Sequence, residues 1–228
     1  MDDKYFNRKT FIFLSNLEKN NNRDWFHENK QEYEDTIREP ALNFIADISG
    51  DLARISPHFN AIPKKIGGSL MRVYRDVRFG KNKTPYKTNI GIQFRHEIGK
   101  DVHAPGFYIH ISPEECFIGA GIWRPDSAAL KKIRDRIIEK DNEWIKITQK
   151  KAFKNAFELA GESLINAPRG YPKDHPLLED LKRKDHIAIT PIKKNIISSD
   201  QFKKEVLRSF RDSSDYTQFL CKSLNLNY

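Results

Sequence analysis

Apolar residues in the first third of the chain recur at helical spacing. Phe11, Leu14 and Leu17 form one stripe, which predicts a helix ending at the polar run 20–22. Asn22 is suited to cap a second helix, because its side-chain oxygen can accept a hydrogen bond from a free backbone amide of the first turn. The apolar positions of that second helix are Trp25, Phe26, Tyr33 and Ile37.

Pro40 is predicted to interrupt the second helix and to open a third, because proline lacks a backbone N–H but fits a first helical turn. The middle of the chain then alternates apolar and polar residues, as half-buried strands do. Proline and glycine between these runs leave short connections, which favour antiparallel pairing. The predicted strands cover residues 70–74, 90–94, 107–111 and 116–118.

The last part of the chain returns to a helical pattern. Asp126 is placed to cap a helix with Leu130, Ile133 and Ile137 on its inner side, and residues 167–172 must form a loop. Further elements are predicted at 176–184 (helix), 186–192 (strand), 201–210 (helix) and 216–224 (helix). The prediction is an α+β fold: one domain of residues 1–228, with a central, mainly antiparallel sheet flanked by N-terminal and C-terminal helices.

Composition narrows the class of protein. The 228 residues include 15 Phe, 8 Tyr and 3 Trp, enough to build a core despite a charged fraction of 31%. No apolar run approaches the about 20 residues that span a bilayer, so we expect no membrane segment. The two cysteines lie far apart, which argues against a disulfide framework and suits a cytoplasmic location.

The net charge of +9 is concentrated in one segment. Residues 64–100 hold ten lysines and arginines but only two acids, whereas residues 1–63 hold eight and eleven. Within the shorter stretch 69–89, Asp76 is the single acid among six cations, which are Arg72, Arg75, Arg78, Lys81, Lys83 and Lys87. Fixed like charges repel one another unless an anion joins them, so the segment predicts a local anion-binding site.

The residue types suit that chemistry. Arginines bind phosphate or carboxylate through two parallel hydrogen bonds, lysines add point charge, and Asp76 could hold one arginine in place. Trp123 and Arg124 precede a capped helix start whose amides could assist, although Asp126 competes for them. The predicted ligand-binding residues are Arg72, Arg75, Asp76, Arg78, Lys81, Lys83, Tyr86, Lys87, Trp123 and Arg124. The alternative is a solvated basic loop whose arginines pair with the acidic N-terminal helices.

Other chemistries find little support in the sequence. None of the seven histidines has a recognised metal-ligand spacing, and phosphate-loop, dinucleotide and nucleophile-elbow motifs are absent. We therefore expect no metal and no cofactor, and catalytic residues stay unassigned. If the protein is an enzyme, Asp76 and His110 are the candidate proton carriers. Tyr108 and His110 are predicted to share one strand face.

Several segments resemble those of one family, the domain of unknown function 2461. The most specific is Arg-Val-Tyr-Arg-Asp-Val-Arg-Phe at 72–79, followed by Lys-Asn-Lys-Thr-Pro-Tyr-Lys at 81–87. The runs at 13–17 and 20–26, Gly-x-Trp-x-Pro at 121–125 and Pro-x-Gly-Tyr at 168–171 also match its pattern. Gly80 and Asn82 stand where Ser and Asp are expected, which makes this loop more positive. The resemblance implies a single-domain cytosolic protein and brings no activity with it.

These observations favour binding of a small phosphate- or carboxylate-bearing ligand in a basic pocket around residues 72–87. The alternative is a nucleic-acid-binding module that uses the same segment, where Tyr74, Phe79 and Tyr86 are interleaved with the cations. An acidic protein partner is a third hypothesis. The absence of a known nucleic-acid motif and the acidic N-terminal third favour the small ligand. Convergence of Arg72, Arg75 and Arg78 on one concavity would support it, and the oligomeric state is left open.

Overall fold

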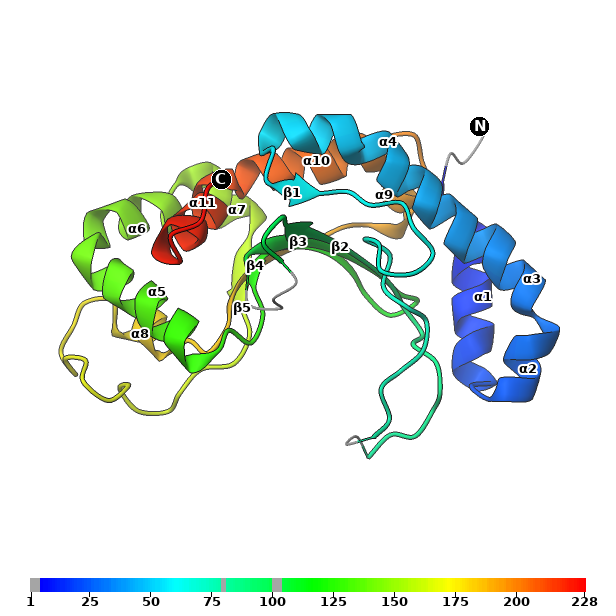
Figure 1. Ribbon diagram of the computed structural model, residues 1–228, viewed down its shortest axis with the longest axis horizontal. Helices are drawn as coiled ribbons and strands as arrows, with labels where there is room; N and C mark the ends of the chain where they lie inside the picture. Colours follow the sequence, from blue (N-terminus) through cyan, green and yellow to red (C-terminus); the bar gives the residue numbers. More distant parts are fainter. Residues whose placement is uncertain (1–4, 79–80, 100–103) are drawn as a thin grey trace.

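A computed structural model describes residues 5–78, 81–99 and 104–228. Its centre is an antiparallel sheet of six strands in the order β1-β2-β3-β4-β6-β5, with helices on its outer side (Figure 1). The architecture confirms the predicted α+β class. The strands are β1 (Phe59–Asn60), β2 (Ile90–His96), β3 (Gly106–Ile111), β4 (Cys116–Ile122), β5 (Glu158–Ala160) and β6 (His186–Pro191).

The helices fall into an N-terminal and a C-terminal group. The first group is α1 (Arg8–Lys19), α2 (Arg23–Glu28), α3 (Lys30–Tyr33) and α4 (Glu39–Ile55). The second is α5 (Ser127–Glu139), α6 (Asp141–Thr148), α7 (Lys151–Ala156), α8 (Leu178–Lys182), α9 (Lys194–Ile197), α10 (Phe202–Asp212) and α11 (Ser214–Ser223). The two predicted caps are confirmed, since Asn22 accepts from the Trp25 amide and Asp126 from the Ala129 amide.

The expected break at Pro40 is wrong. The chain stays helical from α3 into α4 through a π-helical turn at Glu34–Arg38. A proline ring clashes with the carbonyl four residues earlier, here that of Thr36, and a π turn relieves such crowding. The Thr36 carbonyl instead accepts a hydrogen bond from Thr10 Oγ1 on α1 at 3.0 Å. Proline has no N–H to donate to the Thr36 carbonyl, and the hydrogen bond from Thr10 on α1 takes the place of that donor.

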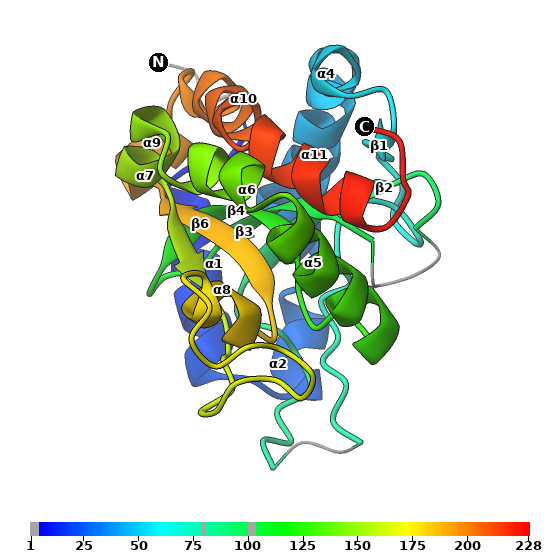
Figure 2. The ribbon, with the colours of Figure 1, turned by 90° about the vertical axis from the view of Figure 1, so that its left-hand side faces the viewer.

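The two faces of the sheet differ. Alternate residues such as Ile92, Phe94 and Phe107 are buried beneath the helices, and Figures 1 and 2 show α4 and α10 on that side. A second buried cluster surrounds Trp144 and joins α5, α6 and α11 to β4 and β6. The opposite face carries the half-buried Gln93, Tyr108 and His110 and faces away from those helices.

The strand predicted at 70–74 is not regular. The described residues 69–78 and 81–89, here called the arm, are irregular, with isolated bridges from Leu70 to Ile92 of β2 and from Tyr74 to Tyr86. Between them, the Lys87 amide donates to the Val73 carbonyl at 2.7 Å. The arm projects from the start of β2 on the side of the sheet opposite α4 and α10, beside α2 (Figures 1 and 2). Leu70, Val73 and Tyr86 of the arm are buried. Pro85 has no amide hydrogen to donate to a strand ladder, and charged residues interrupt the apolar ones, so the arm does not continue as a regular pair of strands.

Candidate functional site

The base of the site is an anchor between the N-terminal helices and the arm. Asn21 lies between α1 and α2, and its amide both donates to the Tyr86 carbonyl and accepts from the Tyr86 N–H, each at 3.0 Å. It therefore bonds the arm as a neighbouring strand would. The Tyr86 ring stacks on Phe26 with centroids 4.1 Å apart. Tyr86, predicted as a ligand residue, is buried and serves as an anchor.

A cleft of about 1050 Å³ lies beside this anchored hairpin. Its walls come from one side of the arm, the preceding segment 60–70, the helical region around Tyr33 and the edge of β2. Five cationic residues line it: Arg38, Lys65, Arg72, Lys87 and Arg95. Arg72 and Lys87 of the predicted set line this cleft, together with cations that lie outside residues 72–87.

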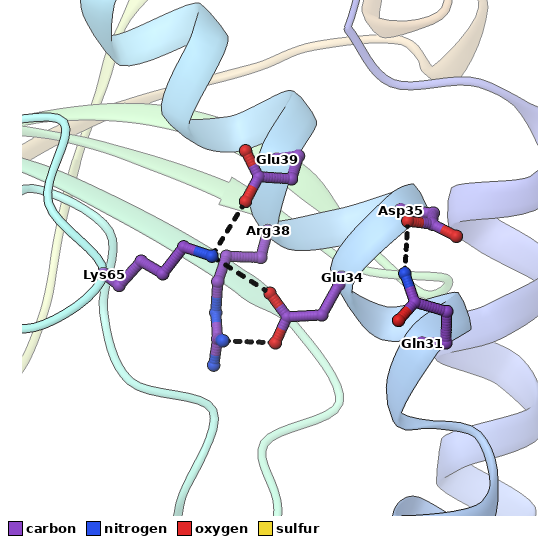
Figure 3. Close-up of polar contacts among 6 residues, drawn as sticks. All are labelled: Gln31, Glu34, Asp35, Arg38, Glu39 and Lys65. Carbon is purple, nitrogen blue, oxygen red and sulfur yellow. Dashed lines mark hydrogen bonds and ion pairs between the residues drawn. The ribbon is translucent and has the colours of Figure 1, made fainter.

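Two of these cations are neutralised within the fold. Figure 3 shows Lys65 reaching across to the helix, with its Nζ 3.1 Å from Glu39 Oε1 and 3.8 Å from Glu34 Oε2. Arg38 pairs with the other oxygen of Glu34. These contacts tie the cleft wall to the helix at the start of α4. They also leave little charge on Lys65 and Arg38 for a ligand.

Arg72 and Lys87 differ from that pair. Within the described part of the chain, no carboxylate forms an ion pair with either side chain. Burial lowers the pKa of Lys87, and the charges of Arg72 and Arg75 lower it further. The three cations therefore lie close enough to repel one another. The alternative in which the acidic N-terminal helices neutralise these arginines has no ion pair to support it among the described residues.

The three arginines do not converge on one concavity. Arg75 lines a second cleft of about 560 Å³ with Arg23 and Lys30, and its Nε is buried without a hydrogen-bond partner. Arg78 lies near the tip of the arm, where both carboxylate oxygens of Asp76 accept from it, at 3.0 and 2.7 Å. The structure thus places Arg72 and Arg75 in neighbouring clefts.

The remaining polar groups of the tip are exposed. Hydrogen bonds from the Arg78 side chain hold the pKa of the Asp76 carboxyl far below its usual range, which confirms that Asp76 holds one arginine in place. Lys83 Nζ donates to the Val77 carbonyl at 2.8 Å, and Lys81 points into solvent. An ionised, paired carboxylate is a poor proton carrier near neutral pH, which weakens Asp76 as a candidate acid.

Trp123 and Arg124 lie elsewhere, in the turn between β4 and α5. Neither residue lines the two clefts at the arm. The Arg124 amide donates to Asp185 Oδ1 at 2.7 Å, and the Arg124 guanidinium lies 4.8 Å from the centre of the Trp123 ring. Asp126 takes the Ala129 amide, so the anticipated competition for the helix start is present. The structure does not bring these residues together with the basic segment.

The sheet face that points away from α4 and α10 carries a polar pair, Tyr108 and His110. Tyr108 and His110 share that face, as predicted, and Tyr108 Oη lies 3.3 Å from His110 Nδ1. Burial raises the pKa of Tyr108 to about 12 and lowers that of His110. His110 also stacks on Phe117, with centroids 4.8 Å apart. The pair is neutral at physiological pH, so it can donate hydrogen bonds but adds no charge.

Sequence reasoning missed several residues of the site. Lys65 and Arg38 reach the cleft only through the fold, and no local pattern marks them. Asn21 had a signal, because it lies in a run that matches the family, but its role needed the contact with Tyr86. Tyr74 was considered only as a base-stacking residue, although it lines both clefts.

Comparison with known proteins identifies the family of this chain. The chain belongs to the family described as conserved hypothetical protein, domain of unknown function 2461, whose sequence model matches residues 9–219. The matched region includes the arm, its Asn21 anchor and the β4–α5 turn. A search of curated proteins finds no match.

Two further searches concern the described residues alone. None of their helices combines the length and apolar character needed to cross a membrane. They also contain no group of three or more His, Cys, Asp or Glu side chains placed to hold a metal ion.

Proposed function

We propose that this protein binds a small anionic ligand, bearing phosphate or carboxylate, in the cleft beside the arm. The observation that carries the proposal is that Arg72 and Lys87 line one cleft, and neither forms an ion pair with a carboxylate of the described residues. Bringing like charges together costs free energy, and a bound anion would repay it. Arg38 and Lys65 contribute less, because Glu34 and Glu39 already neutralise them.

The geometry suits a ligand larger than a bare ion. A cleft of about 1050 Å³ is at the upper end of the range for small-molecule sites. Apolar side chains, among them Ile62, Leu70 and Val73, line it together with the cations. An organic anion would use both kinds of surface, with charge-assisted hydrogen bonds from Arg72 fixing its acidic group.

Calorimetric titration with inorganic phosphate, glucose 6-phosphate and citrate tests the proposal. We expect binding of at least one of them, and a loss of about tenfold in affinity for Arg72→Ala or Lys87→Ala, the scale of one charged hydrogen bond. Lys81→Ala is the matched control, because it removes the same charge from an exposed position outside the cleft. Equal losses for Lys81→Ala and Lys87→Ala would point to diffuse charge and contradict the proposal.

A second candidate function is binding of single-stranded nucleic acid along the arm. It is favoured by the spread of cations over two clefts and the exposed tip, with Tyr74 between them. Such a binder tracks the phosphate backbone, so its affinity falls steeply with salt. Titration with a labelled oligonucleotide at several salt concentrations separates the two functions. Nucleic-acid binding is favoured over a small anion if the affinity falls steeply with salt and if Lys81→Ala lowers it as much as Lys87→Ala does.

A further inference from the structure

Tyr74 occupies a distinctive place in the arm. It lines both the large cleft with Arg72 and the smaller one with Arg75. Its side chain is 55% exposed, although it lies between cations and beside the buried Val73. A large aromatic ring left open where two basic clefts meet presents a flat apolar surface to whatever enters either one.

The ring is held in place from behind. Tyr74 packs against Tyr86 with centroids 5.5 Å apart, Tyr86 stacks on Phe26 at 4.1 Å, and Phe26 packs against Tyr33 at 5.2 Å. The backbone bridge between Tyr74 and Tyr86 fixes the same pair. This row of rings runs from the buried core to the exposed Tyr74. A ring supported in this way loses little conformational freedom when a ligand stacks on it.

We propose that the ligand carries a planar aromatic ring, which stacks on Tyr74 while its phosphate or carboxylate lies against Arg72 and Lys87. This inference rests on the proposed function and names the chemical class of its ligand: an aryl or nucleotide-like anion. Aromatic rings attract one another in offset or edge-to-face arrangements, and base–aromatic stacking adds affinity whatever the base. Tyr74 lines one cleft with Arg72 and the other with Arg75, so a cation is present in each cleft that its ring borders.

Three phosphates that differ in their substituent test the ring requirement. Phenyl phosphate, propyl phosphate and inorganic phosphate are titrated calorimetrically against the full chain. We expect phenyl phosphate to bind about five- to tenfold more tightly than propyl phosphate, the scale of one stacking contact. Tyr74→Phe keeps the ring and should keep this preference, whereas Tyr74→Ala should abolish it. Equal affinities in the wild type, or a preference that persists in Tyr74→Ala, would overturn the inference.

Ile66→Ser is the matched control, because Ile66 lines the same cleft and is largely exposed. It should leave the phenyl preference unchanged; a loss as large as that of Tyr74→Ala would show general apolar contact and overturn stacking. If all three phosphates bind equally and Arg72→Ala weakens them all, the proposed function stands and this inference fails. If none binds, both fail.

Two sources could supply an aromatic phosphate: a free nucleotide and a nucleic acid strand. Adenosine monophosphate and oligothymidylates of increasing length distinguish them. A free-nucleotide site should bind the monophosphate as tightly as the oligomers, with weak salt dependence. A strand site should gain affinity with length and show a steep salt slope. In both cases Tyr74→Ala must weaken binding, and an unchanged affinity for both probes would overturn the inference.

Discussion

The arm and the β4–α5 turn carry similar residues and use them differently. Both combine arginines with an exposed aromatic, Tyr74 in the arm and Trp123 in the turn. In the turn, the buried Asp185 accepts from the Arg124 amide at 2.7 Å and from the Glu162 amide at 2.9 Å, so the polar groups of this region serve the fold. In the arm, Asn21 holds the backbone at Tyr86 and Phe26 holds the Tyr86 ring, but neither contact involves Arg72 or Lys87.

The difference shows how to separate structural from functional polar residues in one chain. Buried polar groups normally find partners, and those of the turn do so within the protein. Arg72 and Lys87 gather in a cleft with no carboxylate paired to them among the described residues. A rigid backbone that presents cations without ion pairs suits a binding site. The conformational entropy of the backbone is already lost on folding, so ligand binding does not have to order it.

The largest effect should come from Gly121→Ala near the end of β4, just before the turn. Gly121 has φ +118°, and an added Cβ would lie 2.0 Å from the His186 carbonyl oxygen, a backbone atom that cannot move away cheaply. We expect a loss of about 3 kcal/mol or more in the free energy of unfolding, measured in urea. Gly50→Ala in α4 is the control, since no atom lies within 4 Å of its added Cβ. Equal losses in the two variants would contradict a structural role for the turn.

Acid sensitivity should also originate near the turn. His186 is fully buried, both ring nitrogens lack partners, and burial, with Arg183 and Arg134, lowers its pKa to about 3. Between pH 6.5 and 3 the unfolded chain therefore binds a proton that the folded protein does not, so stability falls as the pH falls through this range.

The loss attributable to His186 should be about 2 kcal/mol between pH 7 and pH 5. Urea unfolding of wild type and His186→Leu at both pH values measures it as a difference. For each protein, the free energy of unfolding at pH 5 is subtracted from that at pH 7. A destabilisation by the substitution that is the same at both pH values therefore cancels. The variant should lose less stability on acidification; identical losses would show that His186 does not titrate in this way.

A smaller effect is expected in the arm from Asn21→Ala. This change removes both hydrogen bonds to the Tyr86 backbone and leaves buried groups without partners, at a cost of about 1–2 kcal/mol. Faster amide hydrogen exchange at Tyr86 and Lys87, with weaker anion binding, would localise the effect to the arm. Asn20→Ala is the neighbouring control, because its side chain bonds only the Asn16 carbonyl at the exposed end of α1. Unchanged exchange in Asn21→Ala would show that the arm is held by other contacts.

Much of the fold could be predicted from local patterns. Apolar spacing identified α1, β2 and β3, and capping residues set the starts of α2 and α5. The short elements β1, β5, α7 and α9 were missed, because a few residues carry too little periodicity. The break predicted at Pro40 was wrong. The Thr36 carbonyl, which the proline ring crowds, accepts a hydrogen bond from Thr10 on a different helix, and this long-range contact cannot be seen in the local sequence. The strand expected at 70–74 failed because Pro85 and the charged residues around it interrupt the ladder that would pair with it.

The sequence by itself determined where the positive charge of this protein lies and that Asp76 would hold an arginine. Only the tertiary structure decided which charges remain unpaired. Lys65 and Arg38 are neutralised by Glu34 and Glu39, whereas Arg72 and Lys87 line the same cleft with no ion pair to a carboxylate in the described ranges 5–78, 81–99 and 104–228. The physical reason is range: helical periodicity and caps act within a few residues, but ion pairs and clefts join residues that are distant in the chain.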